Sequence, residues 1–246
     1  MRIALLADIH ANKEALEACL AHAAAEGAAR LVFLGDLVGY GGDPLAVTHR
    51  VQALREAGAL VLAGNHDRAA LDGPVGFSAD AAVAIRWTAA QLDAPARDFL
   101  GGLPLTVEEE DRLYVHADAS APEEWHYVHD ADAARRSLDA TEVRLTFCGH
   151  THVPLLCGLT PTGKLARHRP PPGIAMPLQA PWKWIAVMGA VGQPRDGSPA
   201  AAYGLFDPVR GECAWMRVPY DVAAAAARIR AAGLPDRLAA RLAVGR

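Results

Sequence analysis

Residues 3–10 read IALLADIH, an apolar run that stops abruptly at an aspartate and a histidine. A continuous apolar run without alternation is typical of a strand buried on both faces, as in a parallel sheet. Similar runs follow at Leu31–Leu34 and Leu60–Ala63, and each leads directly into glycine and polar residues. Residues just past the carboxyl ends of parallel strands converge on one crevice, so this pattern predicts one polar site at a sheet edge.

Segments of helical composition separate the early strands, and such alternation indicates βαβ units. Helices are expected at Ala15–Ala25, Leu45–Ala57, Asp80–Leu92 and Ala96–Leu100, and near Ala131–Leu138. A hairpin is expected at Leu105–Glu109 and Arg112–His116, and a further strand at Arg144–Cys148. The first part of the chain therefore predicts a mostly parallel sheet with helices packed against it.

The last third of the chain carries short strand-like runs separated by Gly, Pro and Asp turns. These runs are Val153–Leu159, Lys164–Arg167, Trp184–Ala190, Ala202–Phe206 and Glu212–Val218. The proline-rich stretch Arg169–Pro181 is expected to be an irregular loop. Asp221 is expected to cap an alanine-rich helix that ends at Gly233, and a short helix is expected to begin near Pro235. Together the patterns predict an α/β (α+β) fold with two mixed sheets face to face, helices outside, and a single domain over residues 1–246.

Composition narrows the class of protein. The 246 residues are 52% hydrophobic and 21% charged, with a formal net charge of -4, which is typical of an ordinary globular protein. The acidic excess argues against a nucleic-acid polymer as partner, and no apolar run approaches the roughly 18 residues of a membrane span. Four scattered cysteines without a paired spacing indicate a reduced, cytoplasmic protein. The sequence leaves the oligomeric state undefined.

Five polar signals follow apolar runs and carry oxygen and imidazole donors. In chain order they are Asp8-Ile9-His10, Gly35-Asp36, Gly64-Asn65-His66-Asp67, His116 and Gly149-His150-Thr151-His152. Such donors suit Mn, Fe, Zn, Ni or Co better than copper. Seven ligands are too many for one tetrahedral ion and about right for two ions that share a carboxylate. In each alternating pair an extended backbone would point both side chains to the same side.

This ordered set resembles that of the calcineurin-like metallophosphoesterases. The motifs extend over residues 1–153, and the stretches 192–197 and 202–207 are similar to those of small bacterial members. The resemblance implies a four-layer αββα sandwich around two divalent transition-metal ions, with Mn foremost and Fe, Zn, Ni or Co as alternatives. By motif, the first ion would be bound by Asp8, His10 and His152, the second by Asn65, His116 and His150, and Asp36 would bridge them.

The resemblance also implies a catalytic role for His66, which would lie beside the phosphate and stabilise or protonate the leaving group. Asn65 would contact the substrate as well as a metal. Two dications, two carboxylates and a bridging hydroxide leave one net positive charge, which matches a phosphodiester anion. Arg195 could clamp the extra charge of a phosphomonoester, or could be a solvated turn residue. A protein phosphatase would carry an aspartate at the position of Gly39, which would support the catalytic histidine.

The sequence thus predicts a metallophosphoesterase that hydrolyses a small phosphodiester or nucleotide through a metal-bridging hydroxide. The alternatives are a phosphomonoesterase or dinucleoside polyphosphate hydrolase and, after these, a protein Ser/Thr phosphatase or a non-catalytic scaffold. Asn12 is expected to cap the first helix rather than to contact substrate, and Asp67 to hold either the loop or a ligand histidine. The aromatic cluster at Glu123–Tyr127 could stack on a base or aryl group, although loop packing is the favoured interpretation.

Overall fold

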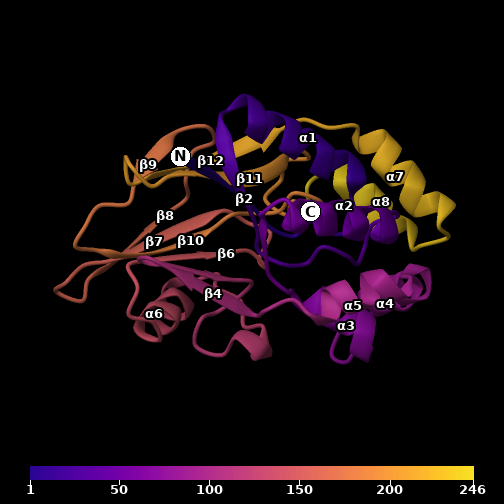
Figure 1. The fold of residues 1–246 in the computed structure, drawn as a ribbon, viewed down its shortest axis with the longest axis horizontal. Helices are drawn as coiled ribbons and strands as arrows, with labels where there is room; N and C mark the ends of the chain where they lie inside the picture. The colour runs from indigo at the N-terminus through magenta and orange to yellow at the C-terminus, as the bar shows by residue number, and fades with distance from the viewer.

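The computed structural model describes residues 1–246, and two six-stranded mixed sheets form its centre (Figure 1). In spatial order, the first sheet contains β3 (Leu60–Val61), β2 (Ala28–Phe33), β1 (Arg2–Leu6), β11 (Ala201–Asp207), β12 (Glu212–Val218) and β9 (Ala175–Pro177). The second contains β4 (Thr106–Glu109), β5 (Arg112–Val115), β6 (Leu145–Cys148), β10 (Lys183–Val187), β7 (Leu155–Leu159) and β8 (Leu165–His168). Strands β1, β2 and β3 run parallel to one another, as do β5, β6 and β10.

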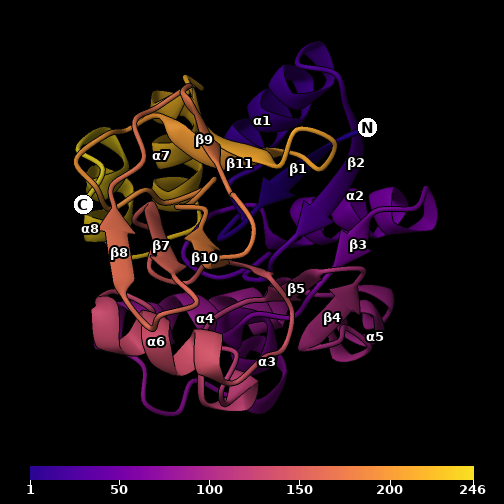
Figure 2. The ribbon, with the colours of Figure 1, turned by 90° about the vertical axis from the view of Figure 1, so that its left-hand side faces the viewer.

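Helices form the two outer layers. They are α1 (Lys13–Ala25), α2 (Pro44–Glu56), α3 (Asn65–Asp72), α4 (Ala79–Gln91), α5 (Ala94–Gly101), α6 (Ala131–Asp139), α7 (Val222–Ala231) and α8 (Asp236–Ala240), with single 3₁₀ turns η1 (Pro122–Glu124) and η2 (Arg241–Ala243). Figure 2 shows α1 and α6 on opposite sides of the pair of sheets. The four-layer αββα sandwich is therefore confirmed. None of these helices has both the length and the apolar character that a membrane crossing requires.

Three packed interfaces explain why the strands are apolar on both faces. In β1, Ile3 and Leu5 belong to the core between the sheets, whereas Ala4 and Leu6 pack on the opposite face with residues of α1. A third cluster joins the outer face of the second sheet to α6 through Leu138. The central strands are thus covered on both faces, and at about 25 cal/mol per Å² this burial is the main stabilising term.

Most of the predicted elements are confirmed, and the differences have local causes. Asn12 caps α1, because its side-chain oxygen accepts a hydrogen bond from the backbone N–H of Ala15 at 3.1 Å. The proline-rich stretch predicted as an irregular loop contains β9, which pairs with β12. Pro177 is tolerated there because β9 is an edge strand, where the missing N–H faces no neighbour. Helix α3 was not predicted, since its eight residues begin within the polar signal Gly64–Asp67.

A buried hydrogen bond from an indole ring joins the two sheets directly. Trp215 of β12 is 1% exposed, and its indole N–H donates to the backbone oxygen of Val187 in β10 at 2.7 Å. A Trp215→Phe change removes this donor and leaves a small cavity. We expect it to lower the free energy of unfolding by about 2–3 kcal/mol, measured by urea denaturation followed by circular dichroism. Trp182→Phe, on a half-buried ring, is the control; equal losses in both variants would contradict the assignment.

Candidate metal centre

The structure brings all seven candidate ligands to one place, at the carboxyl ends of parallel strands from both sheets. Asp8 and His10 follow β1, Asp36 follows β2, Asn65 follows β3, His116 follows β5, and His150 and His152 follow β6. All except Asn65, which is half-buried, are buried. Backbone hydrogen bonds hold the loops side by side, for example from Asp8 N to Gly35 O at 3.1 Å and from Gly149 N to His116 O at 2.9 Å.

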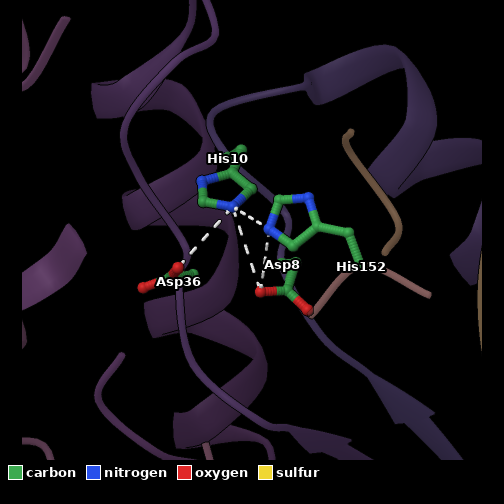
Figure 3. A group of neighbouring side chains, drawn as sticks. All are labelled: Asp8, His10, Asp36 and His152. Carbon is green, nitrogen blue, oxygen red and sulfur yellow. Dashed lines mark hydrogen bonds and ion pairs between the residues drawn. The ribbon is translucent and has the colours of Figure 1, made fainter. Parts of the chain in front are cut away.

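The first group of donors consists of Asp8, His10, Asp36 and His152, and their ligand atoms lie within 4.8 Å of one another. The Nε2 atoms of His10 and His152 are 3.0 Å apart. Asp36 Oδ2 lies 3.6 Å from His10 Nε2, and Asp8 Oδ1 lies 3.4 Å from His152 Nε2. Figure 3 shows the four side chains pointing toward a common point.

The second group shares Asp36 with the first. Asp36 Oδ2 is 3.4 Å from His116 Nε2, and that nitrogen is 3.2 Å from both Asn65 Oδ1 and His150 Nδ1. The ligand atoms of Asp36, His116 and His150 also lie within 4.8 Å of one another. The carboxylate of Asp36 therefore lies between two adjacent sets of donors.

Backbone carbonyls fix the orientation of three imidazoles. The Nδ1 atoms of His10, His116 and His152 face the carbonyl oxygens of Val38, Leu34 and Gln193 at 3.1, 2.7 and 2.6 Å. A carbonyl oxygen only accepts, so each Nδ1 carries a proton and each Nε2 is turned toward the cluster. The Nε2 atoms converge on one another and on two carboxylates, an arrangement that a cation would stabilise. This outer hydrogen bonding is typical of metal-ligating histidines, so the donor set fits nitrogen- and oxygen-preferring transition ions.

Electrostatics favour the neutral state that metal binding requires for three of the four candidate histidine ligands, and favour a charged His116. Burial lowers the pKa of His10 and His152, and lowers that of His150 to about 3, so these rings are neutral. Burial opposes the charge of His116 too, but the carboxylate of Asp36 raises its pKa to about 9. Burial alone would raise the pKa of Asp36, but His116 and His66 hold it well below its usual range. Without a metal ion, the positive charge of His116 thus offsets the negative charge of Asp36, as a bound cation would otherwise do.

The backbone around the centre is strained. Five of the seven candidate ligands have a positive φ; they are Asp8, His10, Asp36, His150 and His152, at 56°, 48°, 54°, 68° and 61°. The extended conformation considered for the alternating pairs is therefore wrong. Left-handed geometry at non-glycine residues costs on the order of 1 kcal/mol each and persists only where surrounding structure imposes it. The concentration of such residues here indicates a functional constraint.

The loop around the centre depends on two further residues. A Cβ atom at Gly64 would lie 2.1 Å from Asp36 Oδ1, so only glycine lets the start of α3 approach that carboxylate. The buried Asp67 accepts hydrogen bonds from the backbone N–H groups of Leu37, Val38 and Gly64 at 2.9, 3.1 and 2.9 Å. The prediction that Asp67 holds the loop is confirmed.

His66 lies beside the first group, in the first turn of α3. Its backbone N–H donates to Asp36 Oδ1 at 2.8 Å, and its ring contacts Tyr40 and Phe77 with centroids 4.4 and 4.9 Å away. Burial lowers the pKa of His66 to about 4, and its Nδ1 has no hydrogen-bond partner. A Cβ at Gly39 would lie 2.4 Å from that Nδ1, so no aspartate fits at this position. The sequence could not say which group polarises His66, and in the structure none does.

Four of the candidate ligands, Asp36, Asn65, His150 and His152, line a cleft of about 690 Å³, which is also lined by His66 and Arg195. Arg195 lies over the ring of Tyr40 at 5.6 Å and donates to Gln193 Oε1 at 2.9 Å. The structure therefore places Arg195 at the cleft and close to His152, whose carbonyl oxygen accepts from its backbone N–H at 3.2 Å.

Two aromatic residues contact candidate ligands, although the sequence favoured loop packing for them. The ring of Tyr127 stacks on that of His150, with centroids 4.1 Å apart and planes at 9°, and Trp125 contacts His116 edge-on at 5.8 Å. Both line the cleft, and Tyr127 is 49% exposed. The cluster at Glu123–Tyr127 was the signal, but loop packing was the favoured interpretation. The neighbouring His126 is exposed.

Comparison with known proteins identifies the family. The calcineurin-like phosphoesterase superfamily domain matches residues 1–210, and this chain belongs to that family. A crystal structure of a metallophosphoesterase from Sphaerobacter thermophilus is 37% identical, with a TM-score of 0.87, and the match covers 100% of this chain and 99% of that chain.

Two archaeal proteins are also similar over nearly their whole length. An uncharacterised protein of Methanocaldococcus jannaschii is 34% identical, covering 99% of this chain and 98% of its own. The crystal structure of a hypothetical protein from Pyrococcus horikoshii shares the fold at 20% identity and a TM-score of 0.81, covering 100% of this chain and 98% of that chain. The matched lengths show that the C-terminal helices of this chain have counterparts in its relatives.

The role of Asp67 can be tested by substitution. Asp67→Ala leaves three buried backbone donors unpaired, and we expect it to lower the free energy of unfolding of the metal-free protein by about 3 kcal/mol. Asp221→Ala removes one exposed cap, from Ala224 N at 2.9 Å, and should cost about 1 kcal/mol. Urea denaturation measures both, and a smaller effect at Asp67 than at Asp221 would refute the assignment.

Proposed function

We propose that this protein is a two-metal phosphoesterase that hydrolyses a small phosphodiester or nucleotide-type substrate. The observation that carries the proposal is the pair of donor groups that meet at Asp36, beside His66, on the wall of one cleft. Membership of the phosphoesterase family supports the reaction class.

The residues divide between the two ions as the motifs imply. Asp8, His10 and His152 would hold the first ion, and Asp36 would be shared; the second would be held by Asn65, His116 and His150. Manganese is the first choice, and Fe, Zn, Ni or Co are the alternatives that the same donors accept. When bound, two such ions activate a water as the nucleophile and offset the charge of the phosphate.

The protein's own side chains would orient the substrate. The half-buried Asn65 has its amide at the cleft, where it can contact a phosphate oxygen. The ring of His66, held between Tyr40 and Phe77, presents one N–H that can donate to the leaving-group oxygen or pass it a proton. Arg195 can clamp a non-bridging oxygen through its guanidinium. None of these roles requires a covalent enzyme intermediate.

The shape of the surface favours a phosphodiester over a phosphomonoester. A second cavity of about 830 Å³ adjoins the cleft, and Tyr127 and Arg195 line both. A phosphate bound between them would have room for a substituent on each side, whereas a monoester would fill one side alone. A dinucleoside polyphosphate would also extend into both cavities, so it and a phosphomonoester remain the alternative substrates.

The two remaining alternatives have less support. In a protein Ser/Thr phosphatase an aspartate would stand at Gly39, where a Cβ would collide with His66. In a non-catalytic scaffold the loss of ligands or of His66 would be expected, yet all seven candidate ligands are present, and His66 lines the cleft together with four of them. A cytoplasmic location is also proposed, supported by four free cysteines that are all buried.

Metal content tests the shared carboxylate. After loading with Mn²⁺ and gel filtration, wild-type protein should retain about two ions per chain. His152→Ala should retain about one, because only the first group is damaged, and Asp36→Ala should lose most of both. Elemental analysis by plasma mass spectrometry gives the counts. The exposed His126→Ala is the control, and equal retention by Asp36→Ala and wild type would disprove a shared ligand.

Activity separates an enzyme from a scaffold. With Mn²⁺ and bis-p-nitrophenyl phosphate, we expect His66→Ala to lower kcat about 100-fold while metal content is unchanged, since it removes only the group at the leaving oxygen. Asp36→Ala should fall to background, and p-nitrophenyl phosphate should give a lower kcat/KM than the diester. Release of p-nitrophenol measures all three. Background rates in the wild type and both variants alike would favour the scaffold.

A further inference from the structure

Four arginines line the cleft beside the candidate metal centre, and one of them, Arg68, already donates to the backbone oxygens of Gly101 and Leu103 at 2.9 and 2.7 Å. The other three are Arg195, Arg237 and Arg241. Arg195 follows β10, whereas Arg237 and Arg241 come from α8 and η2 at the C-terminal end of the chain. Both of the latter lie beyond residues 1–210, to which the superfamily domain matches. This cationic wall is therefore supplied partly by a segment outside that match.

The guanidinium groups of Arg195, Arg237 and Arg241 have no aspartate or glutamate partner. None forms an ion pair, whereas Arg217 pairs with Asp196, and Arg228 pairs with Glu14 at 2.5 Å. The Nε atom of Arg195 is buried without a hydrogen-bond partner, and the Nε of Arg241 donates to a backbone oxygen, that of Arg246, at 2.5 Å. Asp72 and Asp80 also line the cleft but form no ion pair with these arginines.

The surroundings of Arg241 disfavour its positive charge. Arg241 is half-buried, and burial together with the positive charges of Arg195 and Arg237 lowers its pKa below the usual arginine value, while Tyr40 and Asp80 act in the opposite direction. Like charges kept close together cost free energy, which a bound anion would return. The cluster is thus a candidate anion site on geometric grounds, and the field is consistent with it.

Packing holds the backbone that carries Arg237 and Arg241 in place. Leu238 and Leu242 are 1% and 3% exposed and pack with Ile229 of α7 and Ala84 of α4. Arg237 and Arg241 are four residues apart, so they lie on the same face of the helical segment, which is the face toward the cleft. Little backbone freedom therefore remains to be lost when an anion binds.

We propose that Arg237 and Arg241 bind a second phosphate group of the substrate, so that the preferred substrate is a phosphodiester of a nucleotide that carries a further phosphate. The proposal rests on the proposed function, because it places the scissile phosphate at the metal centre of the same cleft. Guanidinium groups match phosphate oxygens in pairs, which favours a phosphate over a single carboxylate. Tyr127 and Trp125, on the histidine side of the cleft, offer ring faces for the base between the two phosphates.

A matched pair of chromogenic substrates tests the preference. Thymidine 5′-(p-nitrophenyl phosphate) and its 3′-phosphorylated derivative differ only in the second phosphate. Wild-type protein should show a kcat/KM at least about tenfold higher for the derivative. In Arg237→Ala/Arg241→Ala the ratio should fall to near one. The double lysine variant, which keeps charge but loses paired donors, should give an intermediate ratio, and Arg86→Ala on the exposed face of α4 should keep the wild-type ratio.

Binding to metal-free protein gives a second readout that does not depend on catalysis. Protein stripped with a chelator and dialysed free of it is titrated calorimetrically with adenosine 3′,5′-bisphosphate and with adenosine 5′-monophosphate. The bisphosphate should bind at least about tenfold more tightly to wild type and to Arg86→Ala, and the difference should disappear in the double alanine variant. Circular dichroism verifies that each variant is folded.

The two readouts separate this proposal from the proposed function. If no substrate is hydrolysed but the arginine-dependent binding difference persists, the anion site stands and the phosphoesterase proposal fails. If hydrolysis occurs but the wild type shows no preference for the second phosphate in either assay, the anion site is overturned. A preference that survives in the double alanine variant also overturns it.

Discussion

The carboxylate of Asp36 is the group on which the arrangement of the site depends. It lies at the N-terminus of α3, accepts the backbone N–H of His66, and faces His10 on one side and His116 on the other. A buried carboxylate in this position requires compensating positive charge, which the helix terminus and the imidazoles supply only in part. The close approach of Gly64, the support from Asp67 and the convergence of both sheets all serve to keep this one anion where two groups of donors can share it.

Sequence reasoning located the site because its signals follow strands in order. The rule that parallel strands deliver residues to one edge placed Asp8, Asp36 and His150 together, although they are far apart along the chain. The same rule could not supply the backbone geometry: five ligands adopt left-handed conformations that no propensity predicts, since surrounding hydrogen bonds impose them. The pairing of β9 was missed for a similar reason, because an edge strand of three residues depends on β12 rather than on its own composition.

The cationic wall of the cleft could not be predicted from the sequence, for a different reason. Arg237 and Arg241 lie in a short, alanine-rich helix with no motif, and many exposed arginines elsewhere in the chain have similar neighbours. Only tertiary packing, through Leu238 and Leu242, turns them toward the cleft. Tyr127 illustrates the same limit, since an aromatic residue in a loop is ambiguous until its ring is seen stacked on His150. Candidate metal ligands that form short motifs after strands can be found from sequence. The residues that line the rest of the cleft cannot, because their position depends on how distant elements pack.

The pairing of the first strand with a late one constrains how the protein can be made. Strand β1 lies between β2 and β11, and Ile3 pairs with Phe206. During synthesis, one edge of the first strand therefore waits without a partner until most of the chain has left the ribosome. A nascent polypeptide in this state exposes an apolar strand edge to other chains, a hazard that chaperones usually limit. The native partner of this edge becomes available only near the end of translation.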